Sequence, residues 1–195
     1  MTSNKTFQKE KEENVMLHAL NTARIRAIPA KNDHLEVVEL VFRENHETFA
    51  LLSAHPDSHA EALSLVTYAE LPPHGLVENL RNFVLFDRES DKPMGILSLY
   101  LGYPDPNTYY IGSLYLRPDW QRDGYGRELM QELQQQLQRG GYAAGRVAVG
   151  LKNWPALRFW TKQGYDTVTM ISGDRSYAAD HYAVIELQKN LGTGT

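Results

Sequence analysis

A short segment with two glycines carries the residues best suited to bind an anion. In QRDGYGREL, residues 121–129, an apolar stretch has just ended and a helical pattern begins. Such a junction presents consecutive backbone N–H groups and the positive end of a helix, which suit a phosphate or pyrophosphate. Gly124 and Gly126 allow close approach of the backbone to a ligand. Arg122 and Arg127 add positive charge to a chain of net charge −4, which favours an anion site. The alternative is an ordinary strand–turn–helix junction, since any such junction can use two glycines.

A dinucleotide site of the Rossmann type fits the same turn poorly. Its fingerprint requires a third Gly or Ala where this chain has Leu129, within an alternating βαβ chain. The strand expected before the turn is instead the third of three consecutive strands, which indicates an antiparallel meander. We therefore do not expect a Rossmann cofactor.

The elements that must position this turn follow from hydrophobic periodicity and turn signals. Alternating residues predict a strand at 23–28, and helical spacing predicts helices from about 33 and over 58–71. A hairpin (82–86 and 94–101) and a strand at 109–116 precede the turn and its helix, which ends at Gly140. The remaining elements are a strand at 146–151, a short helix from about 155, and strands near 165–171 and 181–188. This order predicts one α/β (α+β) domain, with a central mixed, mostly antiparallel sheet of about seven strands flanked by about four helices. We expect residues 1–22 to be a polar tail or helix start, 23–190 the domain and 191–195 a tail.

Composition excludes several classes of function. The chain of 195 residues has no cysteine, which excludes disulfides, Cys-based zinc sites, iron–sulfur clusters and thiol nucleophiles. His55 and His59 have no identifiable third ligand, so we expect no metal site. A net charge of −4 argues against nucleic-acid partners. No apolar run approaches the roughly 18 residues of a membrane span, and we expect a cytoplasmic protein without a membrane partner.

Two blocks of the sequence resemble motifs of the GNAT superfamily of N-acetyltransferases. QRDGYG, residues 121–126, matches the Q/R-x-x-G-x-G/A pyrophosphate loop, and LYLRP, residues 114–118, resembles the strand end before it. NWPALRFWTKQGY, residues 153–165, resembles the second motif, N-x-x-A-x-x-F-Y-x-x-x-G-F. The element order over residues 23–188 agrees with the topology of that family. The resemblance implies a GNAT-like domain with acetyl-CoA as cosubstrate.

In that family the pantetheine arm of the cofactor inserts between two strands that separate near a β-bulge. Gly112 is the residue here that could form the bulge, because an isolated glycine within a strand often marks one. The resemblance implies that the strand backbone and Asn153 contact the arm, that loop amides hold the pyrophosphate, and that the second motif lines the thiol end. For Ala156 and Phe159, simple core packing remains an alternative. The residues implied to bind the cofactor are Leu114, Tyr115, Leu116, Gln121, Arg122, Asp123, Gly124, Tyr125, Gly126, Arg127, Asn153, Ala156, Phe159 and Trp160.

The catalytic residues are not assigned, because the chain departs from the family pattern twice. The Tyr that usually serves as the acid is Trp160, and an indole N–H cannot donate a proton to the leaving thiolate. Tyr110, Tyr115 and Tyr165 are alternatives for that role, as is water. The strand at 109–113 also lacks the usual carboxylate. His74 and Glu78 are the candidate bases, although each could equally be an ordinary surface residue.

The resemblance implies acetyl transfer to a primary amine of a small molecule or peptide. Since there is no cysteine to form an acyl-enzyme, we expect direct attack in a ternary complex of enzyme, acetyl-CoA and amine. Two alternatives remain open: a protein N-terminal or lysine acetyltransferase, and a catalytically silent CoA-binding sensor. The expected assembly is a monomer or a homodimer.

Overall fold

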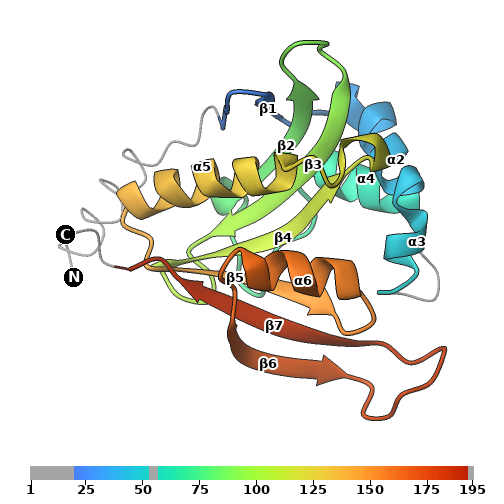
Figure 1. The fold of residues 1–195 in the computed structure, drawn as a ribbon, viewed down its shortest axis with the longest axis vertical. Helices are drawn as coiled ribbons and strands as arrows, with labels where there is room; N and C mark the ends of the chain where they lie inside the picture. Colours follow the sequence, from blue (N-terminus) through green and yellow to red (C-terminus); the bar gives the residue numbers. More distant parts are fainter. Residues whose placement is uncertain (1–19, 53–56, 193–195) are drawn as a thin grey trace.

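The computed structural model describes residues 20–52 and 57–192, and a seven-stranded sheet forms its centre (Figure 1). The strand order is β1-β2-β3-β4-β5-β7-β6. Every neighbouring pair is antiparallel except β4 and β5, which are parallel. The expectation of a mixed, mostly antiparallel sheet is thus confirmed. The strands are β1 Ile25–Pro29, β2 Leu80–Asp87, β3 Pro93–Leu101, β4 Thr108–Leu116, β5 Ala144–Gly150, β6 Thr167–Gly173 and β7 Ala183–Asn190.

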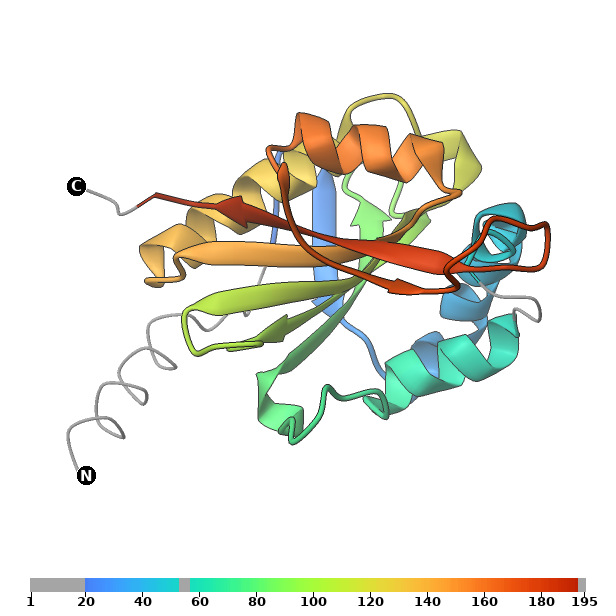
Figure 2. The ribbon, with the colours of Figure 1, turned by 90° about the horizontal axis from the view of Figure 1, so that it is seen from below.

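Helices cover both faces of this sheet (Figure 2). The described parts of the chain contain five α-helices and three 3₁₀ helices, where the sequence predicted about four helices. The α-helices are α2 Leu35–Glu44, α3 His46–Phe49, α4 Ser58–Thr67, α5 Tyr125–Arg139 and α6 Trp154–Lys162. The 3₁₀ helices are η1 Asn32–His34, η2 Val77–Asn79 and η3 Pro118–Trp120. The four residues of α3 carry too little periodicity to be predicted from the sequence.

Helix α5 shows how the sequence specifies a helix that packs on the sheet. Leu129, Met130, Leu133 and Leu137 recur at helical spacing, and all four are fully buried. Together with residues of α6, they pack on β1 to β5 and β7 in the larger of two hydrophobic clusters. The face with α5 and α6 is therefore the closely packed side of the sheet.

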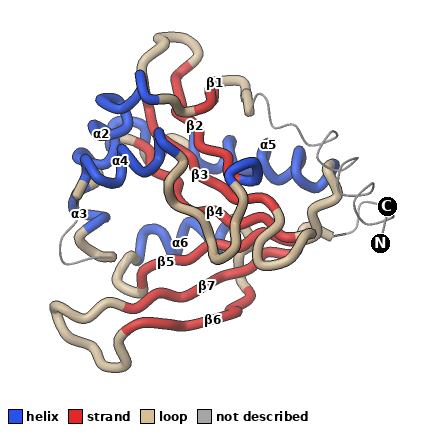
Figure 3. Tube along the Cα trace, turned by 180° about the vertical axis from the view of Figure 1, so that it is seen from behind, coloured by secondary structure: helices blue, strands red, loops and turns tan. Residues whose placement is uncertain are grey.

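The opposite face of the sheet carries α2 and α4, which lie over β2, β3 and β4 (Figure 3). Val38, Val41 and Phe42 of α2 meet Leu65 and Val66 of α4 in the smaller cluster. The side chain that caps α4 is Asp57, which accepts hydrogen bonds from the backbone N–H groups of His59 and Ala60 at 3.0 Å. This side of the sheet is only partly filled with apolar side chains.

The N-terminal residues that the structure describes pack against the domain. Leu20 has no exposed surface, and Thr22 donates a hydrogen bond of 2.5 Å to Glu128 on α5. Folded contacts therefore begin before residue 23, the predicted domain boundary, while residues 1–19 and 193–195 lie outside the described residues. Within the described ranges, no helix is both long enough and apolar enough to cross a membrane.

Candidate active site

The parallel strands β4 and β5 pair over only part of their length. Their register runs from Thr108↔Ala144 to Ile111↔Val147 and ends there. Strand β4 continues to Leu116, whereas β5 stays paired with β7 as far as Gly150↔Val184. The two strands thus separate beyond Ile111, and the β4 backbone from 112 to 116 borders a gap in the ladder.

A bulge in β4 lies at the point of separation. Ser98 of β3 pairs with Ser113, and Leu99 pairs with Ile111, so Gly112 is an extra residue. A Cβ on Gly112 would lie 3.3 Å from the Ser98 hydroxyl oxygen, closer than most real contacts. The bulge expected at this glycine is confirmed.

The bulge changes which face each residue of β4 presents. Before it, the odd-numbered residues Tyr109 and Ile111 are buried in the larger core beneath α5 and α6. After it, the even-numbered Leu114 and Leu116 pack against that core. Residues on the other face therefore come from both sides of the bulge: Tyr110, Gly112, Ser113 and Tyr115.

The turn after β4 has the geometry expected of an anion site. Gly124, at φ 85°, and Arg122, at φ 71°, both have left-handed backbone conformations. No side chain caps the N-terminus of the 15-residue helix α5. The position that a Cβ on Gly124 would occupy lies 3.7 Å from the guanidinium groups of both Arg24 and Arg127. Backbone N–H groups, a helix N-terminus and two guanidinium groups therefore lie together around Gly124.

Arg24, just before β1, is a member of this site that the sequence did not predict. Its guanidinium lies 3.9 Å from the centre of the Tyr125 ring, and Nη1 donates to the Asp123 carbonyl at 3.2 Å. Glu128 holds it in place by accepting from Nε at 2.6 Å. Burial alone would raise the pKa of Glu128, but hydrogen bonds from Thr22 and Arg24 hold that pKa below its usual value. Because 104 positions separate Arg24 from Glu128, no local pattern could indicate the pair.

Gln121, the first residue of the loop motif, has a structural side chain. Its Nε2 donates to the Leu116 carbonyl at 2.7 Å and to Oδ1 of Asn45 at 3.1 Å. Asn45 is buried and donates from Nδ2 to the same Leu116 carbonyl at 3.1 Å. Two side-chain donors therefore occupy this carbonyl, which leaves the backbone of Leu114 as the better placed of the two predicted partners for a pantetheine arm. Asn45, also missed from the sequence, fixes the end of β4 to α2.

The second motif forms α6, which packs beside the turn. Asn153 caps this helix by accepting from the Ala156 backbone N–H at 3.1 Å. A Cβ on Gly126 would meet the Phe159 ring at 3.3 Å, so α5 and α6 approach closely because residue 126 is a glycine. Trp160 is buried in the core, with its ring centroid 5.1 Å from that of Tyr165. The structure thus places Phe159 against Gly126 at the start of α5 and Trp160 in the hydrophobic core.

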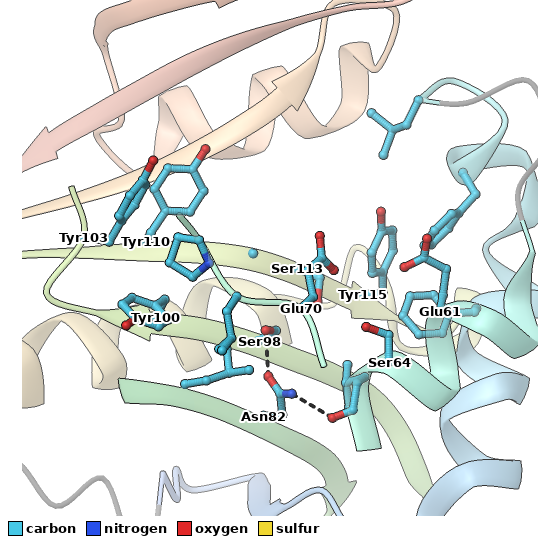
Figure 4. Close-up of a pocket in the computed structure, with 18 residues that line it drawn as sticks. Glu61, Ser64, Glu70, Asn82, Ser98, Tyr100, Tyr103, Tyr110, Ser113 and Tyr115 are labelled. Atoms are coloured by element: carbon cyan, nitrogen blue, oxygen red, sulfur yellow. Dashed lines mark hydrogen bonds between the residues drawn. The ribbon is translucent and has the colours of Figure 1, made fainter. Parts of the chain in front are cut away.

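On the α2 and α4 side, a cavity of about 410 Å³ lies over the bulge (Figure 4). Its floor is polar: Asn82 donates from Nδ2 to the Leu65 carbonyl at 2.7 Å and accepts from the Ser98 hydroxyl at 2.7 Å. Among the described residues that line it, Glu61 and Glu70 are the only charged ones. The lining residues are Phe42, Phe49, Leu52, Glu61, Ser64, Leu65, Glu70, Leu71, Pro72, Leu80, Asn82, Ser98, Tyr100, Tyr103, Tyr110, Gly112, Ser113 and Tyr115.

Three titratable groups that line the cavity have raised pKa values. Partial burial, together with the negative charges of Glu70 and Asp57, raises the pKa of Glu61. Burial and the charge of Glu61 raise the pKa of Tyr115. Burial and the neighbouring Glu186 carboxylate raise the pKa of Tyr110. The pKa of the Glu61 carboxyl group is thus raised toward neutral pH.

The candidate catalytic residues expected from the sequence lie in three different environments. His74 and Glu78 are exposed and do not line the cavity. Tyr165 is fully buried, its hydroxyl lies 2.8 Å from that of Tyr109, and burial raises its pKa to about 12. Tyr110 and Tyr115 line the cavity. The structure therefore places two of the five candidates at the cavity and three away from it.

The carboxylates that do reach the cavity, Glu61 and Glu70, were not expected. Glu61 lies on α4, which the sequence predicted as a helix, and Glu70 follows that helix. Neither belongs to a recognisable catalytic motif. Only the packing of α4 over β2 to β4 brings them to the cavity. The one available signal was the position of Glu70 before Pro72 and Pro73, in the connection to the hairpin.

Comparison with protein families gives a match over residues 50–165 to the acetyltransferase (GNAT) family. Comparison with curated proteins gives no match. Among solved structures, an acetyltransferase from Thermus thermophilus is similar, with a TM-score of 0.66 and 21% identity, covering 88% of this chain and 99% of that one.

Two further solved structures share the fold at lower identity. The ribosomal-protein-S18-alanine N-acetyltransferase of Escherichia coli has a TM-score of 0.63 and 17% identity, covering 88% of this chain and 96% of that one. A ribosomal L7/L12 alpha-N-protein acetyltransferase in complex with coenzyme A has a TM-score of 0.67 and 14% identity, covering 90% of this chain and 99% of that one. At these identities the likeness concerns the fold.

Proposed function

The chain belongs to the acetyltransferase (GNAT) family and uses acetyl-CoA, and we propose that it transfers the acetyl group to a primary amine by direct attack in a ternary complex. The observation that carries this proposal is the arrangement around the β4 bulge. A strand edge open toward β5 and an anion-binding turn lie on one side, and a cavity lies on the other. Cosubstrate and acceptor would thus meet at the bulge from opposite faces.

On the cofactor side, we assign the pyrophosphate to the turn around Gly124. Backbone N–H groups at the start of α5 would bind its oxygens, with Arg24 and Arg127 supplying positive charge. The pantetheine arm would follow the open edge of β4 past Leu114, toward the bulge. This path requires no movement of the strands, because they are already separated.

On the acceptor side, the amine must reach the thioester carbonyl in its neutral form. Alkylammonium groups have pKa values of about 10, so a proton must leave before attack. The nitrogen lone pair then forms a C–N bond to the carbonyl carbon, and the C–S bond breaks. Coenzyme A leaves as a thiolate and takes up a proton, while the amine nitrogen loses its remaining excess proton.

We assign the acceptance of the first proton to Glu61, acting directly or through one water. It lines the cavity, and its raised pKa brings it closer to the proton affinity that suits a general base near neutral pH. The acid limb of the pH–rate profile tests this assignment. That limb should disappear in Glu61→Gln, and its persistence would exclude Glu61 as the base.

The substitution Gly124→Glu tests the cofactor assignment. A carboxylate there would lie among the groups assigned to the pyrophosphate, so we expect acetyl-CoA affinity to fall at least about 100-fold, measured by calorimetry. Gly124→Ala is the matched control, since it introduces the same left-handed strain, about 1–2 kcal/mol, without the charge. Equal affinities for acetyl-CoA in the two variants would contradict the assignment.

A further inference from the structure

We propose that the acceptor is a small amine with an apolar or aromatic body and no anionic group. This inference rests on the proposed function, and it concerns the cavity over the β4 bulge. Three properties of the cavity carry it: the sign of its charges, the position of three tyrosines away from Glu61, and its size.

The charges of the cavity favour a cation and disfavour an anion. Among the lining residues that the structure describes, none is Lys, Arg or His, whereas Glu61 and Glu70 are acidic. Asp57 adds a third negative charge near Glu61. A carboxylate or phosphate on the acceptor would lose water without gaining a cationic partner, and like charges would repel it.

The arginine of β5 beside Tyr110 does not change this balance. Arg146 pairs in register with Tyr110, but its Nη1 donates to Glu186 at 2.9 Å. Glu186 is buried and also accepts from the Thr169 hydroxyl at 2.5 Å. This ion pair neighbours Tyr110 and is not part of the described lining. The guanidinium of Arg146 is therefore already paired and does not offer the tyrosine end of the cavity a partner for an anionic group.

Three tyrosines lie at the end of the cavity away from Glu61. Figure 4 shows Tyr100, Tyr103 and Tyr110 together at this end, Glu61 beside Tyr115 toward the other end, and Glu70 between them. The ring centroid of Tyr103 lies 6.4 Å from that of Tyr100 and 5.6 Å from that of Tyr110, both edge to face. The Tyr100 hydroxyl accepts the Leu76 backbone N–H at 2.7 Å, which fixes that ring. An acceptor can thus place its apolar body among the tyrosines and its amino group near the carboxylates.

The size of the cavity matches a small molecule. About 410 Å³ lies within the range of roughly 300–1,000 Å³ typical of small-ligand sites. The amines of this description include those formed when an aromatic amino acid loses its carboxylate. A decarboxylation is therefore the class of reaction that would supply the substrate.

Pairs of acceptors that differ only in a carboxylate test the proposal. The release of CoA thiol is followed with acetyl-CoA and phenethylamine or phenylalanine, and with tyramine or tyrosine. We expect kcat/KM to be at least about 100-fold higher for each amine than for its amino acid. Phenylalanine amide, which keeps the size of the substituent without its charge, should be a better acceptor than phenylalanine.

A variant of Glu70 shows whether the cavity charge is responsible. Glu70→Lys should raise the KM for phenethylamine and reduce its advantage over phenylalanine at least about 10-fold. Glu89→Gln, an exposed position in the turn between β2 and β3, is the control and should leave both values unchanged. Equal use of phenylalanine and phenethylamine by the unmodified protein, or turnover of peptides alone, would overturn this inference and leave the proposed function intact. An absence of CoA release with every amine, amino acid and peptide would instead overturn the proposed function.

Discussion

The two faces of the sheet are built from the same strands but differ in how they are filled. Beneath α5 and α6 the packing is continuous, and large side chains such as Tyr109, Tyr165 and Leu97 are fully buried. Beneath α2 and α4 a smaller apolar cluster is followed by a cavity with a polar floor and two carboxylates. One face stabilises the fold and the other provides space for a ligand.

Strand β4 contributes to both faces, and the difference between them depends on its bulge. An uninterrupted strand alternates strictly, so residues on one face keep the same parity throughout. The extra residue Gly112 shifts that parity, which returns Leu114 to the packed face and brings Ser113 to the cavity. A single inserted residue thus aligns the cavity with the point where β4 and β5 separate.

The largest effect on stability is expected from a truncation on the packed face. Trp160→Ala removes a buried indole that contacts Phe159 and Tyr165, so the free energy of unfolding should fall by about 3–5 kcal/mol. Chemical denaturation measures this change. Trp154→Ala, on the same helix but with its side chain 70% exposed, should change stability by no more than about 0.5 kcal/mol. Equal losses in the two variants would contradict the distinction between a packed and an exposed side of α6.

An intermediate effect is expected from the polar floor of the cavity. Asn82→Ala leaves the Ser98 hydroxyl without this partner and the Leu65 carbonyl with only the 3.4 Å bond from the Tyr68 N–H, and should cost about 1–3 kcal/mol in unfolding free energy. Ser98→Ala removes only one of these bonds and should cost less. Because the two residues interact, the double variant should be less destabilised than the sum of the single changes, and strict additivity would argue against a shared network.

The smallest effect on stability, with a large effect on activity, is expected at Glu61. The Glu61 side chain lines the cavity and makes no contact in the hydrophobic core. Glu61→Gln should therefore alter the free energy of unfolding by no more than about 0.5 kcal/mol.

The activity of the same variant depends on pH. A base acts only when deprotonated, so kcat/KM of the unmodified protein should fall as the pH drops through the Glu61 pKa. Because that pKa is raised, the fall should begin above the range of an ordinary glutamate, which titrates near about pH 4.3. The Gln variant should lose this limb, while Glu89→Gln should keep it. A large loss of stability in Glu61→Gln would place Glu61 with the structural residues instead.

Much of the fold could be predicted from the chain, because its elements are specified by local patterns. The apolar spacing within 129–137 predicts α5, and the alternation at 23–28 predicts the strand observed at Ile25–Pro29. The predictions were less accurate where the signals are short. Helix α3 was missed, and α4 ends at Thr67 although a helix over 58–71 was predicted, because Tyr68 has a left-handed backbone conformation.

The candidate site, like the fold, could be predicted only where its features are local. The turn at Gly124 could be predicted because left-handed glycine, a helix N-terminus and adjacent arginines are all local features of one segment. The contribution of Arg24 could not be predicted, because only the pairing of β1 with β2 places Arg24 beside α5.

The sequence by itself determined the family resemblance, the order of strands and helices, and the glycine turn before α5. The tertiary structure alone decided which face is packed, that Trp160 and Tyr165 belong to the core, and that Glu61 and Glu70 line the cavity. The physical reason is the separation along the chain over which each interaction acts. Backbone conformation and helix dipoles act within a few residues, whereas the charge and shape of a cavity are set by side chains that meet only when α4 packs across β2, β3 and β4.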